Sequence, residues 1–174
     1  TADDLKSITK LLAKREYEIS SRSVVDVRVS QKGEEVYQGS GLNEVSISRG
    51  SATRVIRVEA RVNGEFLTRY SGDGVIVATP TGSTAYSLSA GGPIIEPSAG
   101  VFAITPVCPH SRSSRPIVVG DQCRIELTAP DQRDDVFMTV DGQTPFHLET
   151  DMVVKICRAE YDLPLIGSPD ASFF

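Results

Sequence analysis

The sequence has 174 residues, of which 40% are hydrophobic, and its 18 Lys and Arg against 23 Asp and Glu give a net charge of -5. This length and composition fit one globular domain with a sizeable core. The negative balance argues against a general nucleic-acid-binding surface, which needs basic residues to displace counterions.

The three cysteines, Cys108, Cys123 and Cys157, form no Cys-x-x-Cys pair. An odd number without such spacing argues against a disulfide framework or a zinc ribbon, so we expect a cytoplasmic protein with no metal site of its own. No apolar run is long enough for a membrane helix, and the first residues lack signal-peptide character. Because they also lack a Met, we expect an interior piece of a longer chain.

The first predicted element is a helix, because Leu5, Ile8, Leu11 and Leu12 recur at helical spacing. The pattern then changes to alternation, with hairpin signals at Asn63-Gly64 and Asp141-Gly142. We expect strands at residues 23–29, 45–48, 57–62, 66–70, 75–78, 102–105, 117–119, 124–127, 136–140, 146–148 and 153–156. Many short strands with regular turns predict a mainly β domain over residues 1–174, an antiparallel two-sheet β-sandwich with one or two short helices.

A hydroxyl-rich segment, residues 79–90, interrupts the strands after the apolar run Val75–Ala78. We expect a tight loop and a helix of about two turns that ends at Gly91-Gly92-Pro93. The first amides of a helix lack internal partners, and small residues allow a ligand to approach them. By pattern alone, a ligand-binding loop and a simple capped helix are equally supported. No Walker A loop or Gly-x-Gly-x-x-Gly fingerprint occurs.

Two further places carry polar groups of interest. Asn43 and Glu44 follow Gly39 and Gly41, and an amide beside a carboxylate suits vicinal ribose hydroxyls. By pattern alone, a solvated turn is the favoured interpretation of these residues. Cys108 and His110 lie close in sequence but lack a third ligand, so a structural histidine is the better interpretation.

The run from Asp73 to Pro93 closely resembles the most distinctive stretch of the NAD kinase family, Asp-Gly-x-x-x-x-Thr-Pro-Thr-Gly-Ser-Thr-Ala-Tyr-x-x-x-Ala-Gly-Gly. Asn43-Glu44 followed by Arg49-Gly50, the run from Thr105 to Pro116, and Asp141-Gly142-Gln143 match further motifs of that family. The resemblance covers nearly the whole chain and corresponds to the C-terminal domain of the family's fold.

The resemblance implies a set of dinucleotide-binding residues. Asn43 and Glu44 would hold ribose hydroxyls, Tyr86 would pack on a base, and Asp73 would bind a dinucleotide held mainly by a neighbouring subunit. The remaining implied residues shape the pocket or line the site: Arg54, Ser71, Thr84, Ala85, Ser87, Leu88, Ser89 and Gln143.

The implied reaction transfers the terminal phosphoryl group of ATP, or of polyphosphate, to the 2′-hydroxyl of the adenosine ribose of NAD, giving NADP. Mg²⁺ or another divalent cation would accompany ATP. The family's catalytic base belongs to a Gly-Gly-Asp-Gly motif on an N-terminal α/β domain, and this sequence lacks that motif. We therefore expect no catalytic residue in this chain, an inactive isolated fragment, and assembly as a homodimer or homotetramer.

Two alternatives remain at this point. A non-catalytic dinucleotide-binding module would share these residues without turning over a substrate. A lipid kinase relative would share the sandwich, although the Asn-Glu and Thr-Ala-Tyr elements argue against it.

Overall fold

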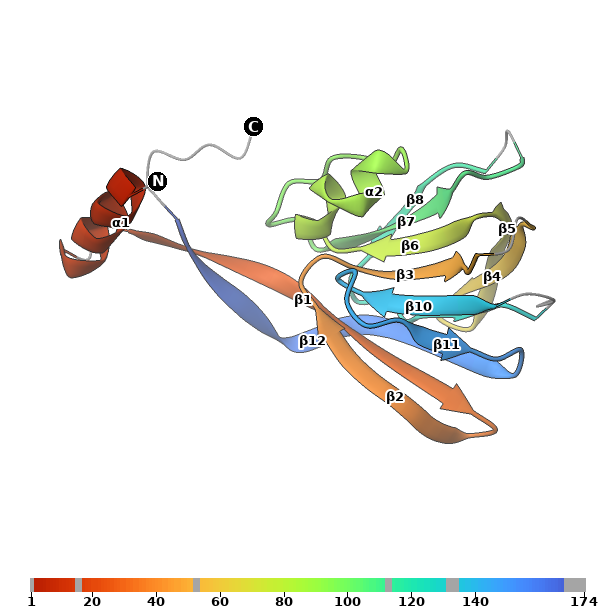
Figure 1. The fold of residues 1–174 in the computed structure, drawn as a ribbon. Helices are drawn as coiled ribbons and strands as arrows, with labels where there is room; N and C mark the ends of the chain where they lie inside the picture. The colour runs from red at the N-terminus through yellow and green to blue at the C-terminus, as the bar shows by residue number, and fades with distance from the viewer. Residues whose placement is uncertain (1, 15–16, 52–53, 112–113, 131–134, 168–174) are drawn as a thin grey trace.

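The computed structural model describes residues 2–14, 17–51, 54–111, 114–130 and 135–167. Within them, two six-stranded sheets pack face to face (Figure 1). In spatial order, the first sheet contains β2 (Glu34–Gly41), β1 (Glu18–Gln31), β12 (Met152–Gly167), β9 (Ile125–Thr128), β4 (Ile56–Val62) and β5 (Glu65–Gly72). The second contains β11 (Phe146–Leu148), β10 (Val136–Val140), β3 (Glu44–Arg49), β6 (Gly74–Ala78), β7 (Val101–Val107) and β8 (Ile117–Gly120).

Neighbouring strands pair antiparallel in both sheets, which confirms the predicted antiparallel β-sandwich. The core lies between the sheets and consists mainly of Val and Ile, which suit a pleated, buried surface. Every residue of β6 is buried, as the continuous apolar run predicts for a central strand. Asn63 and Gly64 have φ of 52° and 83°, which confirms the predicted hairpin turn.

Two parts of the first sheet differ from the prediction. The edge strand β2 is not predicted, because Glu34-Glu35 and the glycines at 39 and 41 obscure its alternation. β1 and β12 are also longer than predicted, because they continue as a two-stranded ribbon away from the sandwich (Figure 1). A register shift between Ser23 and Val25 marks the point where the pairing changes. Local pattern gives no signal for such a ribbon, because its residues lack a buried face.

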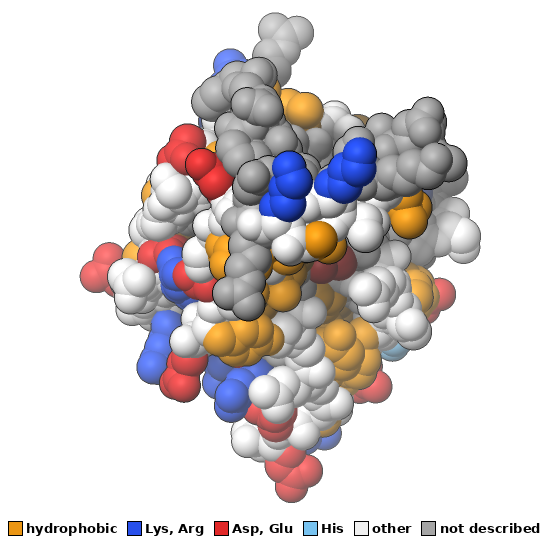
Figure 2. Space-filling model, turned by 90° about the vertical axis from the view of Figure 1, so that its left-hand side faces the viewer, with side chains coloured by type: hydrophobic (Ala, Val, Ile, Leu, Met, Phe, Trp, Pro, Cys, Tyr) orange, Lys and Arg blue, Asp and Glu red, His pale blue; other side chains and the backbone are white. Residues whose placement is uncertain are grey.

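Helix α1 (Ala2–Lys14) confirms the predicted N-terminal helix and lies at the far end of this ribbon (Figure 1). Its apolar residues Leu5, Ile8 and Leu12 are 71%, 55% and 43% exposed. On the ribbon, Ile19 pairs with Ile166, and both are also exposed. Figure 2 shows hydrophobic side chains gathered on this end of the molecule. We call α1 and the ribbon residues 18–23 and 162–167 the apolar arm.

We expect Phe102→Ala to destabilise the fold by about 3–5 kcal/mol, because Phe102 in β7 is 0% exposed and its removal leaves a cavity. Urea unfolding of the variant measures this loss. Phe66→Ala is the matched control: Phe66 in edge strand β5 is 55% exposed, so its replacement should cost well under about 1 kcal/mol. Equal losses in the two variants would contradict the assignment of the core.

Candidate functional site

Two loops meet at one end of the second sheet. Glu44 at the start of β3 pairs with Ala78 at the end of β6, so the turn Leu42–Glu44 and the loop after Ala78 leave the sheet side by side. The Thr79 N–H donates to the Asn43 carbonyl at 2.9 Å, and the Thr79 hydroxyl donates to the Leu42 carbonyl at 2.6 Å. The structure therefore brings the two predicted segments into direct backbone contact.

Gly82 explains why the loop needs a glycine at this point. A Cβ atom added at Gly82 would lie 2.0 Å from the Asn43 carbonyl oxygen, well inside any real contact. The approach of the two backbones is thus possible only without a side chain. Asn43 is half-buried beneath this contact.

Glu44 is the least satisfied charged group of the turn. Its side chain is 6% exposed, and Oε2 has no hydrogen-bond partner among the described residues. Burial raises the pKa of the Glu44 carboxyl, and the nearby charge of Asp141 raises it further. A buried acceptor without a donor is unfavourable for folding, and a ligand hydroxyl would supply that donor.

The prediction of free amides at a helix start does not hold for Gly82 and Ser83, and for the first amides of the helix that begins at Tyr86 it stays a prediction. The segment forms a 3₁₀ turn, η1 (Thr81–Thr84), followed by a single α-turn, α2 (Tyr86–Ser89). The Gly82 N–H donates to the Thr79 hydroxyl at 3.1 Å, and the Ser83 N–H donates to the Pro80 carbonyl at 3.2 Å. These amides are therefore satisfied within the loop, because Thr79 and Pro80 supply the acceptors.

Several hydroxyls of the segment also serve the fold. The Ser83 hydroxyl donates to the Pro80 carbonyl at 2.6 Å and accepts from the Ile95 N–H at 3.0 Å. The Ser87 hydroxyl is fully buried and lies 3.0 Å from the Thr105 hydroxyl. Ser87 therefore holds α2 against β7, and its predicted ligand contact stays a prediction. The exposed side chains of this segment are those of Thr84, Tyr86, Leu88 and Ser89.

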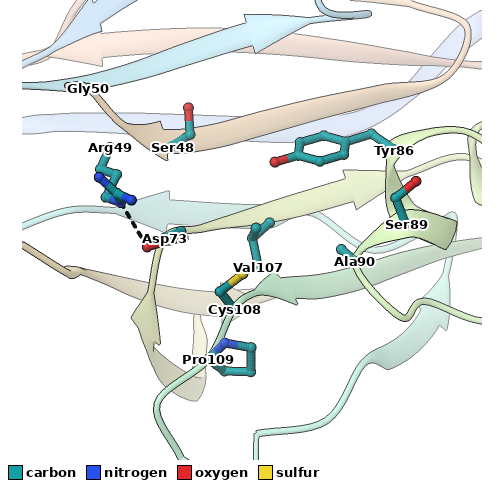
Figure 3. Close-up of a pocket in the computed structure, with 10 residues that line it drawn as sticks. All are labelled: Ser48, Arg49, Gly50, Asp73, Tyr86, Ser89, Ala90, Val107, Cys108 and Pro109. Atoms are coloured by element: carbon teal, nitrogen blue, oxygen red, sulfur yellow. Dashed lines mark hydrogen bonds and ion pairs between the residues drawn. The ribbon is translucent and has the colours of Figure 1, made fainter. Parts of the chain in front are cut away.

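A cavity of about 700 Å³ lies between α2 and the adjoining ends of β3, β6 and β7 (Figure 3). Its lining residues are Ser48, Arg49, Gly50, Asp73, Tyr86, Ser89, Ala90, Val107, Cys108 and Pro109. Three predicted site residues, Asp73, Tyr86 and Ser89, thus share one cavity. The Tyr86 ring extends from α2 over the cavity, across from Asp73 (Figure 3).

Arg49 holds the Asp73 carboxylate in this cavity, with 2.8 Å between Nε and Oδ1. The hydrogen bond from Arg49 is the main cause that lowers the pKa of Asp73, and the Cys108 side chain also contributes. Asp73 therefore presents a fixed negative charge. The sequence does not indicate that Arg49 pairs with Asp73, although Arg49-Gly50 belongs to the motif that follows Asn43-Glu44.

The other predicted residues lie outside this cavity. Arg54 is exposed in the loop before β4, and the Ser71 carbonyl accepts from the His110 N–H. Gln143 lines a second cavity of about 380 Å³, which also includes Tyr37 and Phe146. Their roles, and the ligand contacts of Thr84, Ala85 and Leu88, stay predictions. Of the family motif Thr105–Pro116, residues 112–113 lie outside the described residues.

Asp141 is a second residue that sequence reasoning missed. Its Oδ2 accepts from the Leu42 N–H at 2.7 Å, and its Oδ1 accepts from the Asn43 and Glu44 N–H groups at 2.8 and 3.0 Å. The Asp141-Gly142 pair predicts a hairpin turn, but it does not indicate that the Asp141 carboxylate binds the N–H groups of Leu42–Glu44.

The described residues contain no group of three or more His, Cys, Asp or Glu side chains placed to hold a metal ion. They also contain no helix long and apolar enough to cross a membrane.

The fold is a β-sandwich domain with a cavity toward the Arg49 and Asp73 ends of β3 and β6. Asn43 and Glu44 lie at the other end of this strand pair and do not line the cavity. Residues 42–168 match the family described as the ATP-NAD kinase C-terminal domain, and the chain belongs to this family. This match confirms the resemblance inferred from the sequence motifs.

Relatives and solved structures agree with this assignment. The chain is 39% identical to the NAD kinase of Trichlorobacter lovleyi over 175 residues, covering 100% of the chain and 61% of that protein. It is 44% identical to the NAD kinase of Syntrophotalea carbinolica over 170 residues, covering 97% of the chain and 59% of that protein. The chain thus spans about three fifths of these relatives.

Two solved structures share the fold. Yeast NADH kinase complexed with NADH superposes with a TM-score of 0.86 at 28% identity, covering 94% of this chain and 48% of that one. An NAD kinase from Archaeoglobus fulgidus in complex with ATP gives a TM-score of 0.73 at 29% identity, covering 94% of this chain and 60% of that one.

We expect Glu44→Gln to be more stable than the wild type at neutral pH. The folded-state pKa of Glu44 is raised above its ordinary value of 4.5, so the stability that Glu44 contributes is fully present below this value. That contribution is lost as the pH rises through the raised pKa. Glutamine stays neutral, so the advantage of the variant should shrink as the pH falls through the raised pKa and should be absent below about 4.5.

Urea unfolding across this pH range tests the expectation. Glu65→Gln is the matched control, because Glu65 is exposed on edge strand β5 and its replacement should leave the pH profile unchanged. A Glu44→Gln variant that is less stable than the wild type at neutral pH would contradict the account of this buried carboxyl.

Proposed function

We propose that this chain is the dinucleotide-binding part of an NAD kinase, an enzyme that phosphorylates the 2′-hydroxyl of the adenosine ribose of NAD to give NADP. The observation that carries the proposal is the buried, unpartnered Glu44 oxygen beside a turn locked to the Tyr86 loop. Membership of the family supports it, as do the NADH complex of the yeast relative and the ATP complex of the archaeal one.

In this proposal, the turn holds the ribose. The Glu44 Oε2 accepts a hydrogen bond from a ribose hydroxyl, and the Asn43 amide supplies both a donor and an acceptor beside it. Binding then satisfies a group that the protein alone leaves unsatisfied, so part of the cost of burying Glu44 is recovered when the dinucleotide arrives.

The cavity holds the rest of the dinucleotide. Tyr86 is 43% exposed and offers a flat face for a base, while Ser89 and the ion-paired Asp73 lie around it. ATP, or polyphosphate, is the phosphoryl donor, and the divalent cation arrives on the phosphate oxygens of the donor. The described residues form no metal cluster of their own.

The catalytic base belongs, in this proposal, to a second α/β domain with the Gly-Gly-Asp-Gly motif. The apolar arm supports such a partner, because a solitary two-stranded ribbon and a 13-residue helix with exposed Leu and Ile are marginal in water. An apolar surface of this kind marks an interaction site. The greater length of the relatives, of which this chain spans about three fifths, also supports a further domain.

We also propose a homodimer or homotetramer in the cytoplasm. The edge strands β5 and β8 carry the exposed apolar residues Phe66 and Val118, which suit contacts between sheets of neighbouring subunits. The three cysteines are free, as expected in a reducing compartment.

We expect Tyr86→Ala to weaken binding of NAD about tenfold, since stacking of a base on an aromatic ring contributes about 1–3 kcal/mol. Isothermal titration calorimetry with NAD and NADP measures the change. Tyr161→Ala is the matched control, because Tyr161 is 56% exposed on β12 and lines neither described cavity.

The oligomeric state of both variants should be measured in parallel, because a site shared between subunits would respond to dissociation. Undiminished affinity in Tyr86→Ala at an unchanged oligomeric state would contradict the proposed stacking. Absence of NAD binding by the wild type would contradict the proposed function itself.

A further inference from the structure

Asp141 lies in a tight turn whose backbone conformation is unusual for an aspartate. Asp141 and Gly142 have φ of 49° and 64°, and the Gln143 N–H donates to the Val140 carbonyl at 3.0 Å. This is a turn with two left-handed residues, for which Asn-Gly and Asp-Gly are the preferred sequences. The conformation therefore favours Asn, Asp or Gly at residue 141, but it does not require a carboxylate.

Among the described residues, the Asp141 carboxylate forms its hydrogen bonds with the Leu42–Glu44 turn. It accepts three consecutive N–H groups, from Leu42, Asn43 and Glu44, with both of its oxygens. Hydrogen bonds to an ionised acceptor are about twice as strong as neutral ones. The Asp141 N–H also donates to the Glu44 carbonyl at 2.9 Å, so the two backbones are joined in both directions.

Neighbouring residues leave room for this contact and close the turn from its other side. A Cβ atom added at Gly41 would lie 2.9 Å from the Asp141 Oδ1, so a side chain there would displace the carboxylate. On the opposite side, Thr79 donates to the carbonyls of Leu42 and Asn43. Asp141 therefore holds the three N–H groups of the turn, and Thr79 holds the carbonyls of Leu42 and Asn43.

We propose that Asp141 is a positioning residue for dinucleotide binding, which fixes the Leu42–Glu44 turn so that the Glu44 Oε2 and the Asn43 amide face the ribose. This inference rests on the function proposed above. Asp141 itself touches no ligand and acts through the three amides that it holds.

A carboxylate at residue 141 lowers the stability of the folded state compared with an asparagine, unless it has a role beyond folding. Its negative charge lies near the buried Glu44 carboxyl, and two neighbouring carboxylates repel each other. An asparagine would keep the preferred turn without this repulsion. The cost is explained if the exact course of the turn matters for binding, because residues that break local rules cluster at functional sites.

The test compares Asp141→Asn with Asp151→Asn by calorimetric titration with NAD. Asparagine keeps the turn but offers one oxygen for three N–H groups, so we expect affinity for NAD to fall about tenfold. Asp151→Asn removes the same charge from an exposed turn, where Asp151 accepts only from Gln31 and pairs with Lys32 among the described residues, and should bind as the wild type does. Asp141→Gly, which tolerates the positive φ and lacks any acceptor, should bind more weakly than Asp141→Asn.

Two further readouts separate positioning from a general structural role. Amide hydrogen exchange should accelerate at Leu42, Asn43 and Glu44 in Asp141→Asn while the core strands keep their protection. In a double-mutant cycle, Asp141→Asn should weaken binding much less in a Glu44→Gln background than in the wild type. Additive effects, or unchanged exchange at the turn, would overturn the proposal.

The outcomes distinguish this inference from the function on which it rests. If the wild type fails to bind NAD, the proposed function is wrong. If the wild type binds NAD and Asp141→Asn binds equally well, only the role of Asp141 is wrong.

Discussion

The site depends on the contact between two backbone segments, the Leu42–Glu44 turn and the loop that begins at Thr79. They follow from the pairing of β3 with β6 at the centre of the second sheet, where every residue of β6 is buried. A central pair of strands is the most rigid support that a sandwich offers, so loops that leave it together keep their relative position. Thr79 joins the two segments by hydrogen bonds, and Gly82 allows their backbones to touch because it has no side chain.

In the proposed function, this construction leaves Glu44 Oε2 without a partner at the position where the ribose would bind. The Glu44 carboxyl is buried, has an oxygen without a donor among the described residues, and lies near the charge of Asp141. Each of these features opposes folding, and the surrounding core of two six-stranded sheets offsets them. Sites often retain such local cost, because a residue optimised for ligand contact is seldom optimised for stability. Asp73 differs from Glu44, because the ion pair with Arg49 satisfies and orients its carboxylate.

Much of the fold follows from local pattern. Alternation and short apolar runs predicted the strands of the second sheet, and Asn63-Gly64 predicted the hairpin between β4 and β5 in the first sheet. Edge strand β2 was not predicted because its glutamates and glycines obscure the alternation. The ribbon of the apolar arm was not predicted because it has no buried apolar face, whereas its helix α1 was predicted. Asp73, Tyr86 and Ser89, which the family motifs single out, line one cavity, whereas Asn43 and Glu44 do not line it. The amides of Gly82 and Ser83 are not free as predicted, because the acceptors that satisfy them belong to the same loop and depend on its exact turn. Arg49 and Asp141 were missed for a related reason: their partners are 24 and about 98 residues away, at distances that only the fold sets.

The most direct test is a titration of the isotopically labelled chain with NAD, followed by the backbone amide signals of Glu44 and Tyr86. If the turn and the loop form one binding unit, both signals should shift along a single saturation curve with the same Kd. A response of Tyr86 without a response of Glu44, or two curves with different midpoints, would contradict the account.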